Sequence, residues 1–299
     1  MLTVRRAESA GSSLYRIYME KPMGKFSGYL LVTDYDDTFC PEHGCPVPEE
    51  NLRAAREFME EGGLFTVATG RDVRSYYSIR HRFTVNAPVV LSNGAVLFDS
   101  ASNTIRSEIT LPPSCREELT AARDAFPGTG MEVHCGENVH VCGATPNLEQ
   151  HLARMGVPVA ETEPESIPLP WTKVVLIAQG NLFGESDASH AIAAWIRENF
   201  PGKYEATPSG AFVDVVAAGS DKGAGVRKLA ELLGIEREKV ICLGDGWNDI
   251  PMLRIAGHAF VPASALEGVK ALECVTVLGE SRTCIRDALQ SITDAQERK

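Results

Sequence analysis

The chain has 299 residues, of which 44% are hydrophobic and 23% charged, and its net charge is −11. These values are typical of a globular protein with a sizeable core, and the length suits one large α/β domain or a core with a second, smaller domain. The acidic balance argues against nucleic acid or an anionic membrane as partner, because both repel negative charge. A small anionic substrate is compatible with it, since local positive groups and a metal ion outweigh the mean field.

The eight cysteines show no paired spacing of the kind that binds zinc. Scattered thiols without a disulfide framework are typical of the reducing cytoplasm. No stretch is apolar enough to predict a membrane span, and the first residues lack the apolar segment of a signal peptide. We therefore expect a cytoplasmic protein.

The first residues of the chain carry no structural signal. Residues 1–27 are polar and show no periodic pattern, whereas a strong strand signal begins near Tyr29. We interpret 1–27 as an N-terminal extension, with Met23 as an alternative natural start.

Buried strands and a helix alternate between residues 29 and 91. The apolar runs 29–33, 64–68 and 88–91 predict buried strands. A helix is expected over 48–61, because its proline and two acidic residues suit a first turn. This order implies right-handed crossovers and a parallel sheet.

After Asp99 the pattern changes to a mixture of a hairpin and helices. The expected elements are a helix opened by a capping box of Ser114 and Glu117, hairpin strands at 131–135 and 139–143, a helix from Asn147 to Gly156, a strand at 171–178 and a helix at 186–200. We interpret residues 100–207 as a separate α+β module.

From Phe212 the buried-strand pattern returns, followed by a helix at 222–233 and a strand at 240–243. The expected fold is therefore α/β, with a Rossmann-like parallel-sheet core that an α+β domain interrupts. The expected division of the chain is an extension at 1–27, a first core part at 28–99, the inserted domain at 100–207 and a second core part at 208–299.

Three acids in four positions, Asp34, Asp36 and Asp37, directly follow the first strand. The carboxyl ends of parallel strands are where ligands bind in open α/β sheets. One residue separates Asp34 from Asp36, so a turn after Asp34 brings both carboxylates to one phosphoryl group, as nucleophile and as proton donor. A turn capped by an aspartate is the structural alternative.

A second acidic segment, Gly244-Asp245-Gly246-Trp247-Asn248-Asp249, follows the strand at 240–243. Its glycines permit a sharp turn, and the carboxylates of Asp245 and Asp249 suit a hard cation such as Mg²⁺. Asn248 and Asp249 also suit the start of a helix, which is the structural alternative.

Two further sites are weak on their own. Thr69 follows a strand, where a hydroxyl and backbone amides suit a phosphate oxygen. Lys222 opens a helix, where a cation opposes the helix dipole unless an anion lies nearby. The structural alternative for Thr69 is an ordinary threonine at the end of a strand, and that for Lys222 is a solvated surface lysine. Together the four sites supply a nucleophile, a proton donor, a phosphate clamp and a metal site, which phosphoryl transfer needs.

With these motifs the chain resembles the haloacid dehalogenase (HAD) superfamily, specifically its Cof-type (subclass IIB) phosphatases, from about Tyr29 to Ile292. Ser92-Asn93-Gly94-Ala95 looks like the Asn-Gly-Ala segment before the Cof-type cap, and Asp221-Lys222-Gly223 looks like the lysine motif of the family. The module at 100–207 fits the α+β cap domain that the family inserts into its core.

The resemblance implies a phosphoric monoester hydrolase that depends on Mg²⁺. Asp34 would form an aspartyl-phosphate, and Asp36 would protonate the leaving oxygen and then activate water. The implied phosphate contacts are Thr69, Lys222, Asn248, Asn93 and Gly94. The implied metal ligands are the Asp34 carboxylate, the Asp36 main-chain carbonyl and Asp245, with Asp249 as a ligand or next to one.

Asp36 also distinguishes relatives, because dehalogenases of the superfamily lack an acid at this position. An alkoxide leaves poorly without a proton, so Asp36 favours phosphate esters. The chain departs from the family pattern at Asp37, at Trp247 and at Ser264, which stands in place of an asparagine. None of these departures removes a catalytic group.

The expected partner is a small phosphorylated metabolite such as a sugar phosphate, with no nucleic acid and no membrane, and the chain is expected to be a monomer or homodimer. Cap residues that offer substrate contacts, none of them assigned, are Glu132, His134, Asn138, His140, Trp171 and Lys173. Two alternatives stay open: a phosphomutase of the phosphomannomutase type, and a non-catalytic regulatory binding protein on the same fold.

Overall fold

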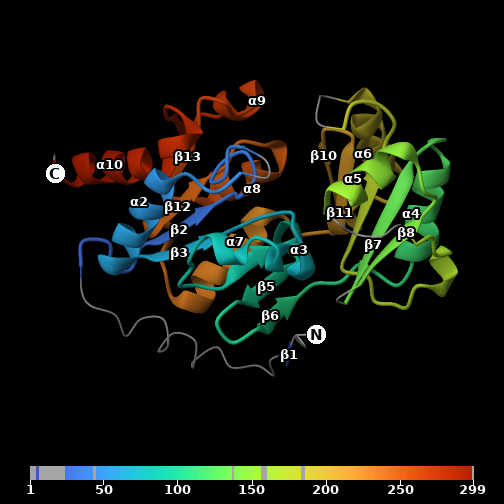
Figure 1. Ribbon diagram of the computed structural model, residues 1–299, viewed down its shortest axis with the longest axis horizontal. Coiled ribbons are helices and arrows are strands. Elements are labelled where there is room, and N and C mark those ends of the chain that lie inside the picture. The colour runs from blue at the N-terminus through green and yellow to red at the C-terminus, as the bar shows by residue number, and fades with distance from the viewer. Residues whose placement is uncertain are drawn as a thin grey trace.

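The computed structural model describes residues 5–6, 24–42, 45–136, 138–155, 160–182 and 186–297. Most of the expected extension at 1–27, including Met23, lies outside the described residues, as do Glu137 and Gly156. The described elements form two parts that lie side by side (Figure 1). One surrounds the strands β2 (Leu30–Thr33), β3 (Leu64–Val67) and β12 (Val240–Leu243), and the other contains the strands from β7 (Gly130–Cys135) to β11 (Phe212–Ala217).

A five-stranded sheet with the order β14-β13-β12-β2-β3 forms the centre of the first part. All four strand pairs are parallel. The strands are β2 Leu30–Thr33, β3 Leu64–Val67, β12 Val240–Leu243, β13 His258–Val261 and β14 Val275–Val277. This parallel sheet with helices on both faces confirms the expected α/β, Rossmann-like core.

Successive residues of the buried strands point to opposite faces of this sheet, so each face has its own core. Leu31 packs in the cluster that includes Phe58 of helix α2 (Glu49–Glu60) and Ile285 of helix α10 (Cys284–Glu297). Leu30 packs in the cluster that includes Val226 of helix α7 (Lys222–Leu233). The helices around this sheet are α2 Glu49–Glu60, α3 Val73–Tyr77, α7 Lys222–Leu233, α8 Ile250–Ile255, α9 Glu267–Lys270 and α10 Cys284–Glu297.

The strand expected at 88–91 does not belong to the parallel sheet. It forms β4 Val89–Leu91, at the edge of a second sheet with the order β1-β6-β5-β4. Its chain reverses in a short turn at Ser92–Gly94 and pairs antiparallel with β5. An isolated parallel bridge between Ala68 and Val90 links β4 to the end of β3. The other strands of this second sheet are β1 Arg5–Arg6, β5 Val96–Asp99 and β6 Thr104–Glu108.

The second part contains an antiparallel sheet with the order β10-β11-β9-β7-β8. Its elements are α4 Cys115–Asp124, β7 Gly130–Cys135, β8 Asn138–Cys142, α5 Pro146–Met155, β9 Lys173–Ile177, α6 Asp187–Asn199, β10 Tyr204–Ser209 and β11 Phe212–Ala217. Short 3-10 turns complete the chain at Arg80–Arg82, Ser92–Gly94, Pro164–Ser166, Arg237–Lys239, Trp247–Asp249 and Ser281–Thr283.

Two expectations for this part were wrong. The strand from Phe212, expected to return to the core, instead forms β11 and pairs with β9 and β10, because the chain reverses at Gly210, whose φ is +57°. The capping box at Ser114 and Glu117 does not form, since Ser114 has a helical backbone and its side chain makes no capping hydrogen bond. The domain boundaries at 28 and 100 stay a prediction, whereas the boundary at 208 does not agree with β11, which continues to Ala217 within the antiparallel sheet.

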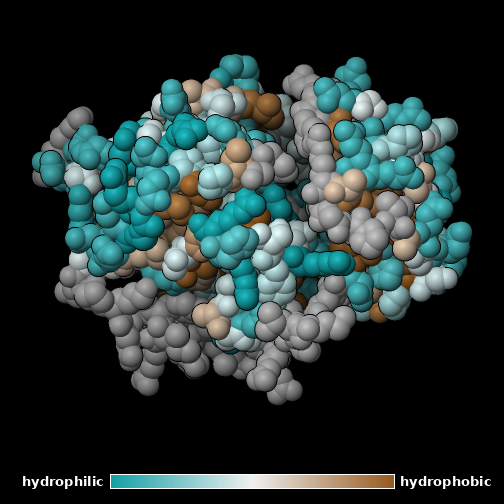
Figure 2. All heavy atoms as spheres, in the orientation of Figure 1, coloured by the Kyte–Doolittle hydropathy of each residue, from teal (hydrophilic) through white to brown (hydrophobic). Residues whose placement is uncertain are grey.

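The surface in the view of Figure 2 is mainly hydrophilic over both parts. Among the described residues, the exposed large hydrophobic side chains are Leu169, Trp247 and Val277. No helix in the described ranges has the length and apolar character to cross a membrane.

Phe58 tests the packing of α2 on the parallel sheet. Its side chain is fully buried and packs against Phe26, with the ring centroids 4.9 Å apart and the rings tilted by 45°. We expect Phe58→Ala to lower the free energy of unfolding by about 3–5 kcal/mol, because the lost ring leaves a cavity. Urea unfolding followed by circular dichroism measures the change. Leu169→Ala, at a position that is 39% exposed, is the control. An equal loss of unfolding free energy in this variant would contradict the packing role of Phe58.

Candidate active site

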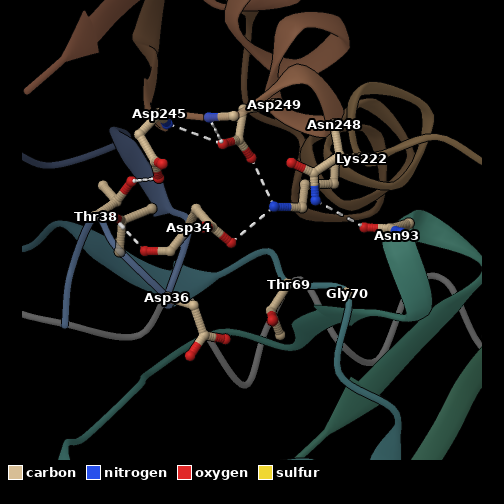
Figure 3. Close-up of polar contacts among 12 residues, drawn as sticks. Asp34, Asp36, Thr38, Thr69, Gly70, Asn93, Lys222, Asp245, Asn248 and Asp249 are labelled. Atoms are coloured by element: carbon tan, nitrogen blue, oxygen red, sulfur yellow. Dashed lines mark hydrogen bonds and ion pairs between the residues drawn. The ribbon is translucent and has the colours of Figure 1, made fainter. Parts of the chain in front are cut away.

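The predicted site residues meet at one edge of the parallel sheet. Asp34 follows β2, Thr69 follows β3 and Asp245 follows β12, and these three strands are neighbours that run in one direction. Their carboxyl ends therefore lie together. Lys222, the first residue of α7, reaches the same place (Figure 3).

Lys222 lies between two aspartates at the centre of this site. Its Nζ is 2.7 Å from Oδ1 of Asp34 and 2.6 Å from Oδ1 of Asp249, and its side chain is fully buried. Burial by itself disfavours the ammonium form, but the charges of Asp249 and Asp34 outweigh burial and raise the pKa of Lys222. The lysine is therefore a fixed positive charge next to the carboxylate of Asp34.

Both carboxylate oxygens of Asp249 have partners within the protein. While its Oδ1 binds Lys222, its Oδ2 accepts from the backbone N–H groups of Asp245 and Gly246, both at 2.9 Å. A Cβ at Gly244 would come within 2.5 Å of the Asp249 side chain, so glycine is needed there. These contacts fix the turn after β12 and the orientation of Lys222.

The acidic cluster carries more negative charge than Lys222 balances. Ligand oxygens of Asp34, Asp245 and Asp249 all lie within 4.8 Å of one another. Burial, and then the neighbouring carboxylates, raise the pKa of Asp34 well above its usual range despite Lys222. Burial and the charge of Asp249 raise the pKa of Asp245 to about 7. Buried carboxylate oxygens whose negative charge is only partly balanced fit Mg²⁺ as a ligand set.

Thr38 orients the carboxylate of Asp245, a contact that the sequence did not single out. Its buried hydroxyl donates to Oδ1 of Asp245 at 2.5 Å. The signal that could have indicated a role for Thr38 is its position in the same acidic segment as Asp34.

The carboxylate of Asp36, the predicted proton donor, does not point toward Asp34. Both of its oxygens bind Arg71, Oδ2 to Nε at 2.9 Å and Oδ1 to Nη2 at 2.7 Å. In Figure 3 the carboxylate of Asp36 points away from Asp34 and Asp245. The guanidinium of Arg71 also lies over the ring of Tyr35, 5.3 Å from its centroid. In this segment the sequence predicts a role only for the hydroxyl of Thr69 and the backbone amides, and it gives no signal for the contact of Arg71 with Asp36.

The remaining predicted phosphate contacts lie on the other side of Lys222 (Figure 3). Asn248 donates through Nδ2 to Oδ1 of Asn93 at 3.2 Å. The backbone N–H of Asn93 donates to the carbonyl of Thr69 at 3.1 Å, which joins the turn at 92–94 to the loop after β3. A Cβ at Gly94 would lie 2.0 Å from the carbonyl oxygen of Asp221, so a glycine allows α7 to approach this turn.

Residues of the antiparallel sheet also reach the site. Lys173 of β9 binds the carbonyl of Gly70 at 2.9 Å and Oδ1 of Asp214 at 2.6 Å, and Oδ2 of Asp214 accepts from Asn93 at 2.7 Å. The sequence left Lys173 unassigned and missed Asp214, because no local pattern shows which loop a strand of another sheet faces.

A second contact between the sheets involves His134 of β7. Its Nδ1 is 3.2 Å from Oδ2 of Asp72, the residue that caps α3, and its Nε2 is 2.8 Å from Oε1 of Glu132. Burial would lower the pKa of His134, but the hydrogen bonds of Asp72 and Glu132 raise it to about 9. The imidazolium therefore stays charged at neutral pH and ties the antiparallel sheet to α3.

Comparison with known proteins assigns the chain to a family. A model for haloacid dehalogenase-like hydrolases (Hydrolase_3) matches residues 31–279. The chain therefore belongs to this family, and the resemblance that the four motifs indicated is confirmed.

The chain is also similar to individual proteins over most of its length. YitU of Bacillus subtilis (strain 168), a 5-amino-6-(5-phospho-D-ribitylamino)uracil phosphatase, is 22% identical over 251 residues, which cover 82% of this chain and 90% of YitU. The HMP-PP phosphatase of Klebsiella pneumoniae (strain 342) is 23% identical over 256 residues, which cover 85% of this chain and 91% of that protein. The solved structure of the HAD subclass IIB sugar phosphatase BT4131 has a TM-score of 0.71 at 20% identity, with 90% of this chain and 98% of that chain covered, and it shows the same fold.

The buried lysine should matter for stability as well as for the site. We expect Lys222→Met to lower the free energy of unfolding by about 3 kcal/mol or more in metal-free buffer, because two buried carboxylates lose their partner. Urea unfolding measures this. Lys228→Met, on the exposed side of the same helix, is the matched control. Adding Asp249→Asn to Lys222→Met should recover part of the loss; equal stability of the two lysine variants would refute the role of Lys222.

Proposed function

We propose that the protein is a Mg²⁺-dependent phosphatase that hydrolyses its substrate through an aspartyl-phosphate on Asp34. The observation that carries this proposal is the position of the Asp34 carboxylate. It lies at the end of β2, binds the buried Lys222 at 2.7 Å and belongs to a cluster of three carboxylates. A nucleophile for phosphorus next to a fixed cation is the arrangement that phosphoryl transfer requires.

The residues around Lys222 bind the phosphoryl group in this proposal. Lys222 neutralises charge on its oxygens, and the hydroxyl of Thr69 donates to one of them. Asn93, Gly94 and Asn248 offer amide groups from the side opposite to the acidic cluster. These groups are fixed before substrate arrives, so they stabilise charge without reorganisation.

Oxygen ligands would hold the metal. The carboxylates of Asp34 and Asp245 and the main-chain carbonyl of Asp36 are the proposed ligands, and Asp249 lies next to them and orients Lys222. When bound, Mg²⁺ supplies positive charge that offsets the repulsion between Asp34 and a phosphate dianion. Thr38 keeps the carboxylate of Asp245 in position through its hydroxyl.

The reaction has two steps. In the first, a carboxylate oxygen of Asp34 forms a bond to phosphorus as the bond to the leaving oxygen breaks, and the carboxylic acid of Asp36 gives its proton to that oxygen. In the second, Asp36 takes a proton from water, the water oxygen attacks phosphorus, and phosphate leaves as the Asp34 carboxylate is restored. This role requires the Asp36 side chain to rotate from Arg71 toward the phosphoryl group.

The proposed substrate is a small phosphorylated metabolite such as a sugar phosphate. The names of YitU, HMP-PP phosphatase and BT4131 refer to compounds of this kind. The antiparallel sheet next to Asn93 and Gly70 is the element that would contact the leaving group. All eight cysteines have free thiols, which supports the proposed location in the cytoplasm.

Hydrolysis of p-nitrophenyl phosphate tests the proposal. We expect release of nitrophenol that requires Mg²⁺ and falls by a factor of about 10⁴ or more in Asp34→Asn, which lacks the nucleophile. Asp36→Asn should lower kcat by a factor of about 10²–10⁴, the usual contribution of a general acid. Asp37→Asn, in the same segment, is the control. Turnover that persists in Asp34→Asn, or that needs a bisphosphorylated activator, would contradict the proposal.

Thermal unfolding gives a readout of the metal that does not depend on activity. Mg²⁺ at about 100 times its Kd should stabilise the protein by about 2.7 kcal/mol, because it binds only the folded chain. Asp245→Asn should remove most of this gain, whereas Asp124→Asn on α4 should keep it. A gain of equal size in both variants would show that the ion binds elsewhere.

A further inference from the structure

We infer that Asp214 of the antiparallel sheet is a positioning residue for the phosphate site: it holds Asn93 in place, with Lys173 as its counter-charge. The inference rests on the proposed function, because it takes Asn93 as a phosphate contact. The phosphate site is therefore complete only when the antiparallel sheet packs against the core.

One face of the antiparallel sheet presents polar side chains toward the site. His134 on β7 is the direct partner of Lys173 on β9, and Asp214 on β11 is the partner of Val175 on β9. Paired residues point to the same side of a sheet, and so do residues two apart, so His134, Lys173 and Asp214 share one face. The apolar residues of the opposite face, such as Val174 and Val213, pack in the cluster of α4 and α6.

Asp214 makes the direct connection to the core. Its Oδ2 accepts from Nδ2 of Asn93 at 2.7 Å, and Oδ1 of Asn93 accepts from Asn248 at 3.2 Å. The side-chain amide of Asn93 is thus fixed at both ends, by Asp214 of the antiparallel sheet and by Asn248 of the turn after β12. Asn93 is only 4% exposed, so the loss of either partner leaves a polar group that water does not easily reach.

The backbone at Asn93 needs such support. Ser92, Asn93 and Gly94 have φ values of +50°, +51° and +97°, three successive residues in the left-handed region. Side chains disfavour this region, and a non-glycine residue held there costs about 1–3 kcal/mol. Backbone hydrogen bonds from Ser92 to Arg71 and from Asn93 to Thr69 hold the turn from the core, and Asp214 holds it from the other sheet.

Lys173 extends the same contact to the loop after β3. Its Nζ binds the carbonyl of Gly70 at 2.9 Å as well as Asp214 at 2.6 Å. A Cβ at Gly70 would meet Oδ2 of Asp214 at 3.2 Å and Oδ1 of Asn93 at 3.3 Å, so the three groups are packed against one another. Asp214 and Lys173 therefore fix both segments that flank the proposed phosphate position.

Stability alone does not account for this ion pair. The side chains of Lys173 and Asp214 are 6% and 18% exposed, and a pair so deeply buried gains little over apolar residues of the same size. An apolar pair, however, offers no acceptor to Asn93 and no donor to Gly70. The charge of Lys173 also offsets that of Asp214, which would otherwise repel a phosphate bound next to Asn93.

Phosphate affinity tests the inference. The probe is inorganic phosphate, measured with Mg²⁺ by calorimetry and as a competitive inhibitor of p-nitrophenyl phosphate hydrolysis. We expect Asp214→Ala to weaken phosphate binding by about tenfold or more, the usual effect of losing a charge-assisted hydrogen bond. Asp214→Asn keeps an oxygen that accepts from Asn93 and should recover most of the affinity. Equal affinity of Asp214→Ala and the unaltered protein would overturn the inference.

A double-mutant cycle separates positioning from a general loosening of the two sheets. In an Asn93→Ala background, Asp214→Ala should change phosphate affinity by less than about twofold, because its effect passes through Asn93. Effects that add in full would overturn the inference. If Asp214→Ala does not fold because Lys173 is left unpaired, Asp214→Ala with Lys173→Met removes the unpaired charge and serves in its place.

Glu118→Gln is the matched control. Glu118 binds Lys203 and Tyr204 within the same part of the chain, away from Asn93. Its substitution should leave phosphate affinity unchanged, and an equal loss would contradict the specific role of Asp214. Phosphate binding without p-nitrophenyl phosphate hydrolysis would count against the proposed function alone, whereas normal hydrolysis with phosphate affinity insensitive to Asp214→Ala would count against the inference alone.

Discussion

The site depends on one buried positive charge, the ammonium of Lys222. It is the only cation in direct contact with the carboxylates of Asp34 and Asp249 among the described residues. A lysine buried in this way retains its proton because two anions touch it, and the anions in turn remain close together because the lysine lies between them. This balance leaves an excess of negative charge at Asp34 and Asp245, a donor set that fits a hard cation. The loop after β12, the start of α7 and the end of β2 are all fixed by this set of contacts.

The sequence was sufficient to predict the parts of the site that lie at strand ends. Asp34, Thr69 and Asp245 each follow a short apolar run, and parallel pairing of those runs brings them together. The same reasoning predicted the α/β core. It did not predict that the strand at 88–91 turns back into another sheet, because the left-handed turn at 92–94 depends on contacts with residues distant in sequence.

Local sequence patterns did not predict the contacts between the two parts of the chain. Asp214 lies in an alternating strand, Phe212–Ala217, that reads equally well as a core strand or as a strand of the inserted module. Which loop its carboxylate meets is decided by the packing of one sheet on the other. The pairing of Asp36 with Arg71 was unpredictable for a similar reason, since both residues are in loops whose relative position follows from the tertiary structure.

The adjacency of β2 and β12 has a consequence for the synthesis of the protein. The hydrogen bond from Thr38 to Asp245 joins residues 207 positions apart, and the β2–β12 pairing spans a similar length of chain. During translation, the segment that contains Asp34 and Thr38 leaves the ribosome long before the segment that contains Asp245. Until then the edge of β2 has no partner on that side and exposes unpaired backbone groups, a state prone to aggregation. The nascent chain therefore passes through a long interval in which it is inactive and vulnerable, and this interval ends only when β12 inserts beside β2.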